Sequence, residues 1–144
     1  MAKQNRIERI FPATTNILAE LREFVAREGA RFGLDALALH NLALAIDEAA
    51  TNIIEHVLPR KSSSIRCACS DTPNHKQVVY EISWESDEPY SPDPVPNPTE
   101  IRRRVEARTP GGLGVYLIHA LVDEIEYDYR NGMCIMRLKK QKHK

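Results

Sequence analysis

The chain has 144 residues with 20 basic and 20 acidic side chains, so its formal net charge is zero at pH 7. Such a balance lacks the electrostatic signature of a protein that binds nucleic acid or an anionic membrane. No apolar run approaches the length of a membrane span, and no signal-peptide core follows the first residues. Three cysteines argue against a disulfide framework and are typical of a reducing compartment. We therefore expect one soluble cytoplasmic domain over residues 1–144.

The first part of the chain predicts a strand followed by two helices. Residues 7–11 alternate roughly between apolar and polar side chains, which is typical of a short strand. Apolar side chains then recur at helical spacing from residue 17 to residue 25, and Gly33 predicts the end of this helix. Asp35 can cap a second helix, which runs to about Leu58 because neither Gly nor Pro interrupts it earlier.

Turn-forming residues separate the remaining predicted strands. The segment Asp71-Thr72-Pro73-Asn74-His75 predicts a turn between the first two of them, and Asn131-Gly132 is a strong hairpin signal between the last two. The lysine-rich end from Lys139 is expected to be a frayed tail. The four strands are predicted over residues 63–70, 77–84, 124–130 and 133–138.

A proline-rich stretch interrupts this pattern. Five of the ten residues from Pro89 to Pro98 are proline, which fits neither the interior of a helix nor a central strand. We expect this stretch and the basic residues Arg102 to Arg108 to form a long exposed connection, which in a compact domain is either a lid or disordered. A third helix is predicted after it, over residues 115–122.

The predicted order is strand, two helices, two strands, the long connection, one helix and two strands. This order favours the α+β class, as a two-layer α/β sandwich in which a mostly antiparallel sheet carries three helices on one face. No internal repeat is visible in the sequence.

Reactive side chains gather on the second predicted helix. Glu48, Asn52 and His56 are spaced four residues apart, so they form a stripe on one side of the helix, away from its apolar face. A carboxylate can act as a general base or bind a metal ion, and an asparagine carbonyl is a hard oxygen ligand suited to magnesium. In isolation most such pairs are solvated surface residues, and His56 is expected to have a structural role.

The segment Gly111-Gly112-Leu113-Gly114 stands directly before the third predicted helix. Glycines let the backbone approach a ligand closely, and the free N–H groups of a first helical turn bind phosphate. The segment is neither a Walker loop nor a dinucleotide-binding fingerprint. Taken alone, it predicts either a phosphate site or no more than a tight turn.

Three blocks, taken in order, resemble the anti-sigma factor serine/threonine-protein kinase family: LAIDEAATNIIEH, YSPDP and GGLGVYLIHALVDEIEYDYRNGMCIMRL. This family belongs to the superfamily of histidine-kinase-like ATPases, with gyrase, Hsp90 and mismatch-repair proteins, so the resemblance implies the Bergerat ATP-binding fold. It also implies that Asn52 holds the magnesium of bound ATP and that Glu48 is the general base that activates a serine hydroxyl. Gly112 and Gly114 would line the nucleotide site, and Gly111 would lie at the hinge of an ATP lid over about residues 89–112.

The adenine-binding motif departs from the family pattern. Members carry Asp-x-Gly, in which the Asp recognises the adenine amino group, where this chain has Glu85-Ser86-Asp87. Glu85 can still accept a hydrogen bond from the amine, whereas Asp87 puts a side chain and a negative charge in the place of a glycine. Alternatively, Asp87 replaces the missing Asp in a shifted register. The implied nucleotide-binding residues are Asn52, Glu85, Asp87, Gly111, Gly112, Leu113 and Gly114.

Three functions remain open on sequence grounds. The first is an ATP- and magnesium-dependent kinase that phosphorylates a serine on a small anti-sigma antagonist domain and sequesters a sigma factor by partner switching, as a homodimer. The second is a binding module of the same fold that has lost kinase activity. The departure of Glu85-Ser86-Asp87 from the adenine-binding motif suggests it. The third is the catalytic domain of a sensor histidine kinase. It is the least favoured, because no phosphoacceptor helix is visible in the sequence. None of the three implies direct binding to nucleic acid or to a membrane.

Overall fold

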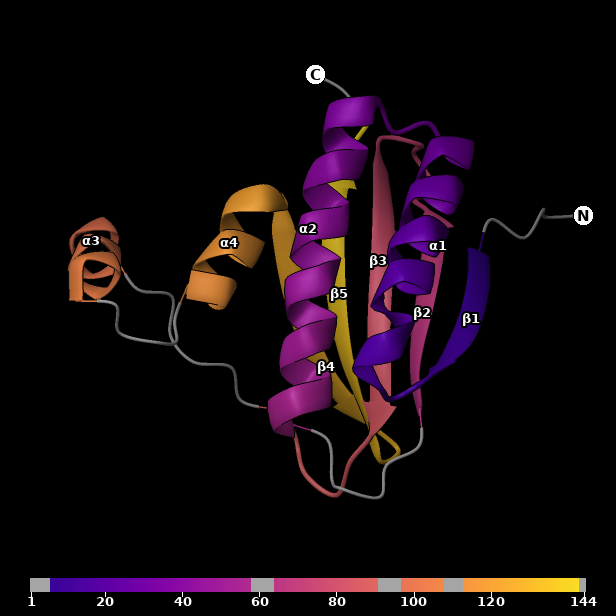
Figure 1. Ribbon diagram of the computed structural model, residues 1–144. Helices are drawn as coiled ribbons and strands as arrows, with labels where there is room; N and C mark the ends of the chain where they lie inside the picture. Colours follow the sequence, from indigo (N-terminus) through magenta and orange to yellow (C-terminus); the bar gives the residue numbers. More distant parts are fainter. Residues whose placement is uncertain (1–5, 58–63, 91–96, 108–112, 143–144) are drawn as a thin grey trace, which may run out of the picture.

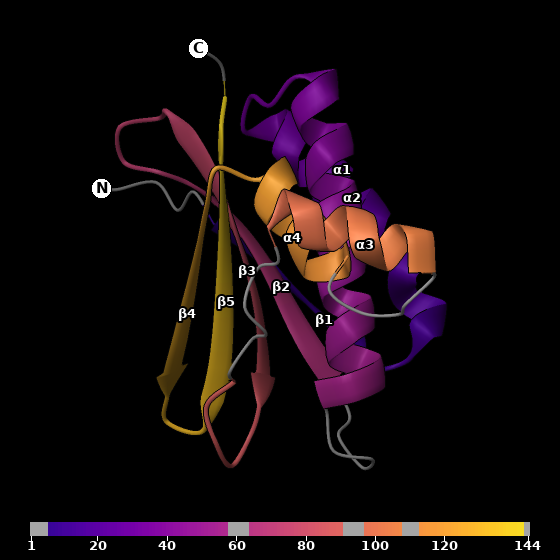
Figure 2. The same ribbon diagram turned by 90° about the vertical axis from the view of Figure 1, so that its left-hand side faces the viewer.

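Five antiparallel strands form one layer of the molecule, and helices cover one face of it (Figure 1, Figure 2). The computed structural model describes residues 6–57, 64–90, 97–107 and 113–142. The strands lie side by side in the order β1-β2-β3-β5-β4. They are β1 (Arg6–Pro12), β2 (Ser64–Asp71), β3 (Gln77–Glu85), β4 (Glu124–Arg130) and β5 (Met133–Gln141).

The helices α1, α2 and α4 lie on one face of the sheet, and α3 lies outside this layer, beyond α4 (Figure 1, Figure 2). The α-helices are α1 (Leu18–Arg31), α2 (Ala36–Asn52), α3 (Pro98–Ala107) and α4 (Leu113–Leu121). A short 3-10 turn, η1 (Thr15–Ile17), precedes α1, and a π-helix, η2 (Ile53–Val57), continues α2. This arrangement confirms the predicted α+β sandwich. In the part of the chain that the structure describes, no helix combines the length and hydrophobicity needed to cross a bilayer.

Capping and turn residues set the ends of these elements as the sequence predicts. The Asp35 carboxylate accepts a hydrogen bond from the Ala38 N–H at 2.9 Å and so caps α2. Gly33, after α1, has a φ of 103°, in the left-handed region that glycine adopts at little cost. Asn131 and Gly132 have φ values of 52° and 77°, as a tight hairpin turn between β4 and β5 requires.

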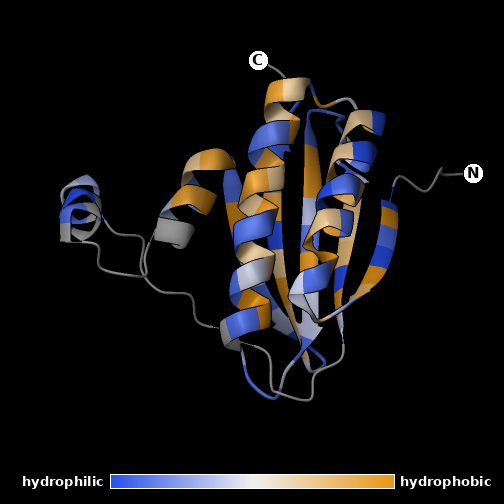
Figure 3. Ribbon diagram, viewed as in Figure 1, coloured by the Kyte–Doolittle hydropathy of each residue, from blue (hydrophilic) through white to orange (hydrophobic). Residues whose placement is uncertain are grey.

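The hydrophobic core lies between the sheet and the helices. Alternate residues of β2 and β3 point into it and are almost fully buried: Ile65, Cys67, Cys69, Val78, Tyr80, Ile82 and Trp84. The Tyr80 hydroxyl donates a hydrogen bond to the Val25 carbonyl of α1 and so ties that helix to the sheet. Hydrophobic residues dominate the coloured part of α4, whereas α3 is mostly hydrophilic, which agrees with its place outside the core (Figure 3).

Helix α3 corrects the prediction of a connection without secondary structure. Pro98 is the first residue of α3, a position where its missing N–H costs nothing. The Asn97 side chain accepts a hydrogen bond from the Glu100 N–H at 2.8 Å and fixes the start of the helix. The segments 91–96 and 108–112 of the predicted connection lie outside the described residues. The described part of the chain therefore has four α-helices rather than the predicted three.

The lysine-rich C-terminal residues belong to the sheet, so the prediction of a frayed tail was wrong. Strand β5 continues to Gln141, which pairs with Gln77 of β3. The Lys140 ammonium donates a hydrogen bond to the Leu121 carbonyl at the end of α4, at 3.1 Å. The neighbouring strand supplies a ladder of hydrogen bonds to these residues, and their own composition gives no sign of it.

Candidate functional site

Glu48 and Asn52 lie one helical turn apart at the end of α2. Both side chains are half-buried, whereas Ala49 and Ala50 of the same helical turn face the core. Asn52 is the last α-helical residue, and the chain continues directly as the π-helix η2. Such π-helical turns are rare and occur frequently at functional sites. The periodicity of the sequence did not predict this one. His56 lies within η2, and its side chain is outside the described part of the structure.

The Asn52 carboxamide contacts a residue that is distant in the sequence. Its Nδ2 donates a hydrogen bond to the Tyr90 hydroxyl at 3.4 Å. The Tyr90 ring stands edge-on to Trp84, with ring centroids 5.6 Å apart, and is tilted against Tyr127 at 5.8 Å. We call Trp84, Tyr90 and Tyr127 the aromatic cluster. It joins β3, the segment after β3, and β4 to the end of α2, and the sequence alone did not predict it.

The aromatic cluster contains an unpaired polar group. Trp84 is 1% exposed, yet its indole N–H has no hydrogen-bond partner in the described structure. A buried donor without an acceptor costs about 1–3 kcal/mol, so this indole N–H reduces the stability of the fold. Burial, and then the neighbouring Tyr90, raise the pKa of Tyr127, so its hydroxyl is neutral at neutral pH. The cluster therefore presents uncharged aromatic surface beside Asn52.

Glu85 and Asp87 are exposed residues at the end of β3 and just after it. Side chains alternate between the two faces of a strand, so the burial of Trp84 beneath the helices places Glu85 on the opposite, open face. Ser86 is held by its N–H, which donates to the Gly132 carbonyl in the β4–β5 turn at 2.9 Å. The structure therefore does not bring Glu85 to the side of the sheet on which the candidate residues of α2 lie.

Leu113 and Gly114 are the first residues of α4, whereas Gly111 and Gly112 lie outside the described residues. Helix α4 packs against α2 and runs antiparallel to it (Figure 1). The start of α4 is therefore directed toward the end of α2 that carries the candidate residues. A helix start has free N–H groups and a partial positive charge, and both favour an anion.

The described residues include no cluster of three or more His, Cys, Asp or Glu side chains that could hold a metal ion. Cys67 and Cys69 are buried free thiols, and burial raises the pKa of each, to about 12 for Cys69. Neither therefore offers a thiolate ligand at neutral pH. A magnesium ion at Asn52 would take most of its coordinating oxygens from water and from the phosphates of a bound nucleotide. Magnesium commonly binds in this way together with substrate phosphates.

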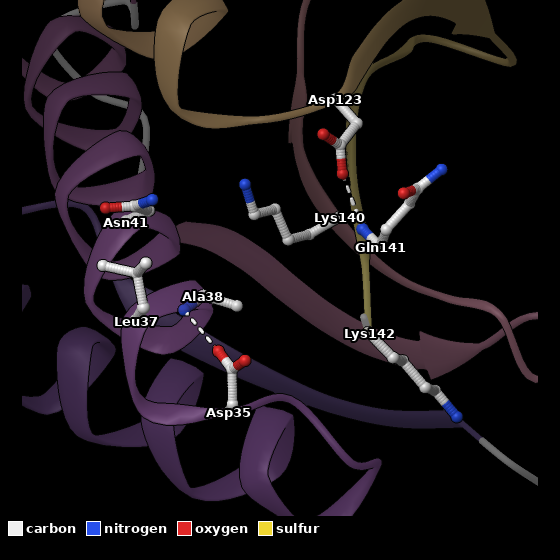
Figure 4. Close-up of a pocket in the computed structure, with 8 residues that line it drawn as sticks. All are labelled: Asp35, Leu37, Ala38, Asn41, Asp123, Lys140, Gln141 and Lys142. Atoms are coloured by element: carbon white, nitrogen blue, oxygen red, sulfur yellow. Dashed lines mark hydrogen bonds between the residues drawn. The ribbon is translucent and has the colours of Figure 1, made fainter. Parts of the chain in front are cut away.

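A separate cavity of about 230 Å³ lies near the start of α2 (Figure 4). The start of α2 with its N-cap, the α4–β4 connection, and the end of β5 with the residue after it line the cavity: Asp35, Leu37, Ala38, Asn41, Asp123, Lys140, Gln141 and Lys142. The backbone N–H of Gln141 donates to the Asp123 carboxylate at 2.6 Å. At 1.5 Å per residue, Asn41 and Asn52 are about 16 Å apart along the helix axis. Of the predicted site residues that the structure describes, none lines this cavity.

The fold and the pair of Glu48 and Asn52 define a class of protein: an α+β sandwich with a carboxylate and a carboxamide at the end of one core helix. A sequence profile of the histidine kinase-like ATPase domain matches residues 11–140. The chain belongs to this family.

Individual relatives agree with the family match. The serine-protein kinases RsbW of Bacillus thuringiensis (strain Al Hakam) and Bacillus cereus (strain B4264) are each 27% identical to this chain over 139 residues, which cover 96% of it and 87% of the relative. A solved structure of the RsbU and RsbW domains of Rv1364c from Mycobacterium tuberculosis covers 99% of this chain with a TM-score of 0.65 and 17% identity. This chain spans about a third (34%) of that longer chain, and the likeness concerns the fold. The resemblance to the anti-sigma factor serine kinases is thereby confirmed.

Proposed function

We propose that this protein is an ATP- and magnesium-dependent serine kinase that also acts as an anti-sigma factor. It would phosphorylate a serine on a small anti-sigma antagonist protein and sequester a sigma factor by partner switching. The observation that carries the proposal is the pair of Glu48 and Asn52 at the end of α2, beside α4, in a chain that matches the histidine kinase-like ATPase domain. The RsbW relatives, which are named serine-protein kinases, support the kinase activity.

Glu48 is the proposed general base. The serine hydroxyl of the antagonist gives its proton to the Glu48 carboxylate while its oxygen bonds to the γ-phosphorus, and the bond from that phosphorus to the bridging oxygen of the diphosphate breaks. ATP, when bound, supplies the phosphoryl group, and magnesium neutralises charge on the phosphates. Because Glu48 is half-buried, its carboxylate can pass the proton on to solvent after the transfer.

The end of α2 fits a magnesium ion that is carried by a nucleotide. Nδ2 of Asn52 is engaged with Tyr90, so the carboxamide has its oxygen left for a ligand, and magnesium prefers a hard oxygen. The described residues offer no multidentate metal cluster. A single protein oxygen combined with phosphate and water oxygens is therefore the coordination that these side chains allow.

We propose that the start of α4 and the glycine segment before it hold the phosphates. Gly111, Gly112, Leu113 and Gly114 would supply backbone N–H groups, and the lid over about residues 89–112 would cover them. Glu85, on the open face of the sheet, is less suited to contact the base.

We further propose that the protein acts as a homodimer in the cytoplasm and contacts the antagonist and the sigma factor, but neither nucleic acid nor a membrane. The resemblance to the anti-sigma kinases supports the dimer and both partners. The equal numbers of acidic and basic residues support the absence of direct contact with nucleic acid or an anionic membrane.

The test is the affinity for ATP with and without magnesium, measured by isothermal titration calorimetry on the wild type and Asn52→Ala. We expect magnesium to tighten ATP binding by about tenfold or more in the wild type and to have little effect in the variant, because one coordinating oxygen is lost. Absence of ATP binding by the wild type at millimolar concentration would contradict the nucleotide site.

A second candidate function is a binding module of the same fold without kinase activity. The exposed position of Glu85 on the open face of the sheet favours it, because this replacement for the adenine-binding Asp does not face Asn52. In this case the protein binds its sigma factor but forms no phosphoserine on the antagonist with ATP and magnesium. Phosphoserine formation at an enzyme-like rate would exclude it.

A further inference from the structure

We propose that Tyr90 is a positioning residue that orients the Asn52 carboxamide so that its oxygen faces the metal of a bound nucleotide. The inference rests on the proposed function, because it takes Asn52 as the magnesium ligand. It adds a residue to that site and assigns a role to one hydroxyl group. It is carried by the contact between Tyr90 and Asn52 and by the packing of the aromatic cluster.

The contact matters because an asparagine side chain has two unlike ends. Its nitrogen only donates hydrogen bonds and its oxygen only accepts them, and a cation binds the oxygen alone. Asn52 directs Nδ2 at the Tyr90 hydroxyl, at 3.4 Å, so Oδ1 is directed away from Tyr90. A half-turn of the amide would present N–H groups to the cation and repel it. In the described part of the chain, this is the one hydrogen bond of the Asn52 side chain.

The Tyr90 hydroxyl is held in place by its ring. The ring meets Trp84 edge-on at an interplanar angle of 74° and lies against Tyr127 at 57°. Trp84 is anchored in the core, and a tyrosine side chain has two main rotatable bonds, so contacts on two sides leave its hydroxyl little freedom. Asn52, by contrast, is half-buried at the junction of α2 and η2. The rigid partner is therefore Tyr90, and the oriented one is Asn52.

Orientation before binding improves affinity, because the ligand no longer has to fix the side chain itself. Loss of one neutral hydrogen bond corresponds to about a three- to tenfold change in affinity. Loss of the Tyr90 hydroxyl should weaken only the magnesium-dependent part of ATP binding, because Tyr90 acts through the Asn52 oxygen. ATP binding without magnesium is therefore the internal control.

The experiment compares Tyr90→Phe with Tyr127→Phe, which removes a hydroxyl from the same cluster and spares Asn52. ATP titrations are run on the full chain with and without magnesium. We expect Tyr90→Phe to weaken ATP binding about three- to tenfold in the presence of magnesium and to leave it within about twofold without the metal. Tyr127→Phe should match the wild type in both conditions. Tyr90→Phe combined with Asn52→Ala should bind no more weakly than Asn52→Ala alone.

A second readout does not depend on nucleotide. In ¹H–¹⁵N spectra of the free protein, the side-chain NH₂ resonances of Asn52 should move in Tyr90→Phe and stay in place in Tyr127→Phe. Unmoved resonances in Tyr90→Phe would show that the nitrogen does not face Tyr90 and would overturn the inference. An equal loss of ATP affinity with and without magnesium, or no loss at all, would also overturn it while the nucleotide site stands. A wild type that binds no ATP would overturn the proposed function and the positioning role together.

Discussion

Lys142, near the C-terminus, forms an ion pair with Asp71 at the end of β2, with Nζ 2.9 Å from Oδ1. The other oxygen of the Asp71 carboxylate lies 2.7 Å from Nδ1 of His75 in the β2–β3 turn. Burial alone would raise the pKa of Asp71, but the hydrogen bonds and charges of His75 and Lys142 outweigh it and hold the pKa below its usual value of 3.8. One carboxylate thus fastens the end of β5 to the β2–β3 hairpin.

This arrangement predicts how stability depends on acid. Because the pKa of Asp71 is lower in the folded chain than in the unfolded one, the ionised carboxylate stabilises the fold above pH 3.8, and this contribution is lost as the pH falls through the folded pKa. Asp71→Asn should lower the free energy of unfolding at about pH 7, and its difference from the wild type should shrink at about pH 3. Urea unfolding at a series of pH values measures this. A difference that does not change with pH would contradict the assignment.

Gly29 in α1 has no room for a side chain. A Cβ atom at this position would meet the Tyr80 hydroxyl and the Leu39 side chain. Gly29→Ala should therefore lower the free energy of unfolding by about 2–3 kcal/mol, because packed groups must move. Gly132→Ala is the control: nothing lies within 4 Å of a Cβ there, and its φ of 77° costs only about 1–2 kcal/mol for a non-glycine residue. A smaller loss of unfolding free energy for Gly29→Ala than for Gly132→Ala would contradict the packing.

Glu81 links three strands on the open face of the sheet. Its carboxylate lies 2.7 Å from Nε of Arg137 on β5 and 3.1 Å from Nη2 of Arg6 on β1. Burial acts to raise the pKa of Glu81, but the hydrogen bonds from Arg137 and Arg6 outweigh it and lower the pKa. Glu81→Gln should cost about 1 kcal/mol, and less at high salt, because screening weakens partly exposed pairs. Chemical unfolding at two salt concentrations checks this, with the exposed Glu124→Gln as the control that should change little.

The role of Glu48 as general base predicts different effects for substitutions of two adjacent carboxylates, Glu48 and Asp47. Glu48→Gln should slow phosphoserine formation on the antagonist about 100-fold or more, because the hydroxyl proton loses its acceptor. ATP affinity should stay within about twofold, since the amide has the same size. Asp47→Asn is the matched control, because the Asp47 carboxylate pairs with Arg22 of α1 at 2.8 Å and has no part in the proposed transfer. Equal rates for Glu48→Gln and the wild type would exclude Glu48 as the base.

Much of the fold could be predicted from local patterns. Alternating apolar residues predicted β3, because that strand has one face in the core and one in solvent. The Asp35 cap and the Asn131-Gly132 turn depend on short-range chemistry, and both are found in the structure. For α3, composition misled the prediction: prolines argued against a helix, although Asn97 and Pro98 form a good helix start.

The candidate site could be predicted only in part. The spacing of Glu48 and Asn52 was visible because both are on one helix, and helical geometry fixes their relation. The contact between Asn52 and Tyr90 joins residues 38 positions apart, and only tertiary packing creates it. The face on which Glu85 lies depends on the strand register around Trp84, which motif alignment does not fix. The start of the π-helix after Asn52 also has no periodic signal.

The order of strands in the sheet also governs how the chain reaches its native state. Strands β4 and β5 meet through a two-residue turn, so this hairpin can form early. Strands β1 and β4 are the two edges of the sheet. Unlike β4, strand β1 pairs with its neighbour, β2, across both α1 and α2, with Pro12 opposite Ser64. Closing the long loop between β1 and β2 costs chain entropy before the contacts between these strands can form. We therefore expect β1 to dock late in refolding and to open first under native conditions, so its backbone amides should exchange with deuterium fastest among the strands.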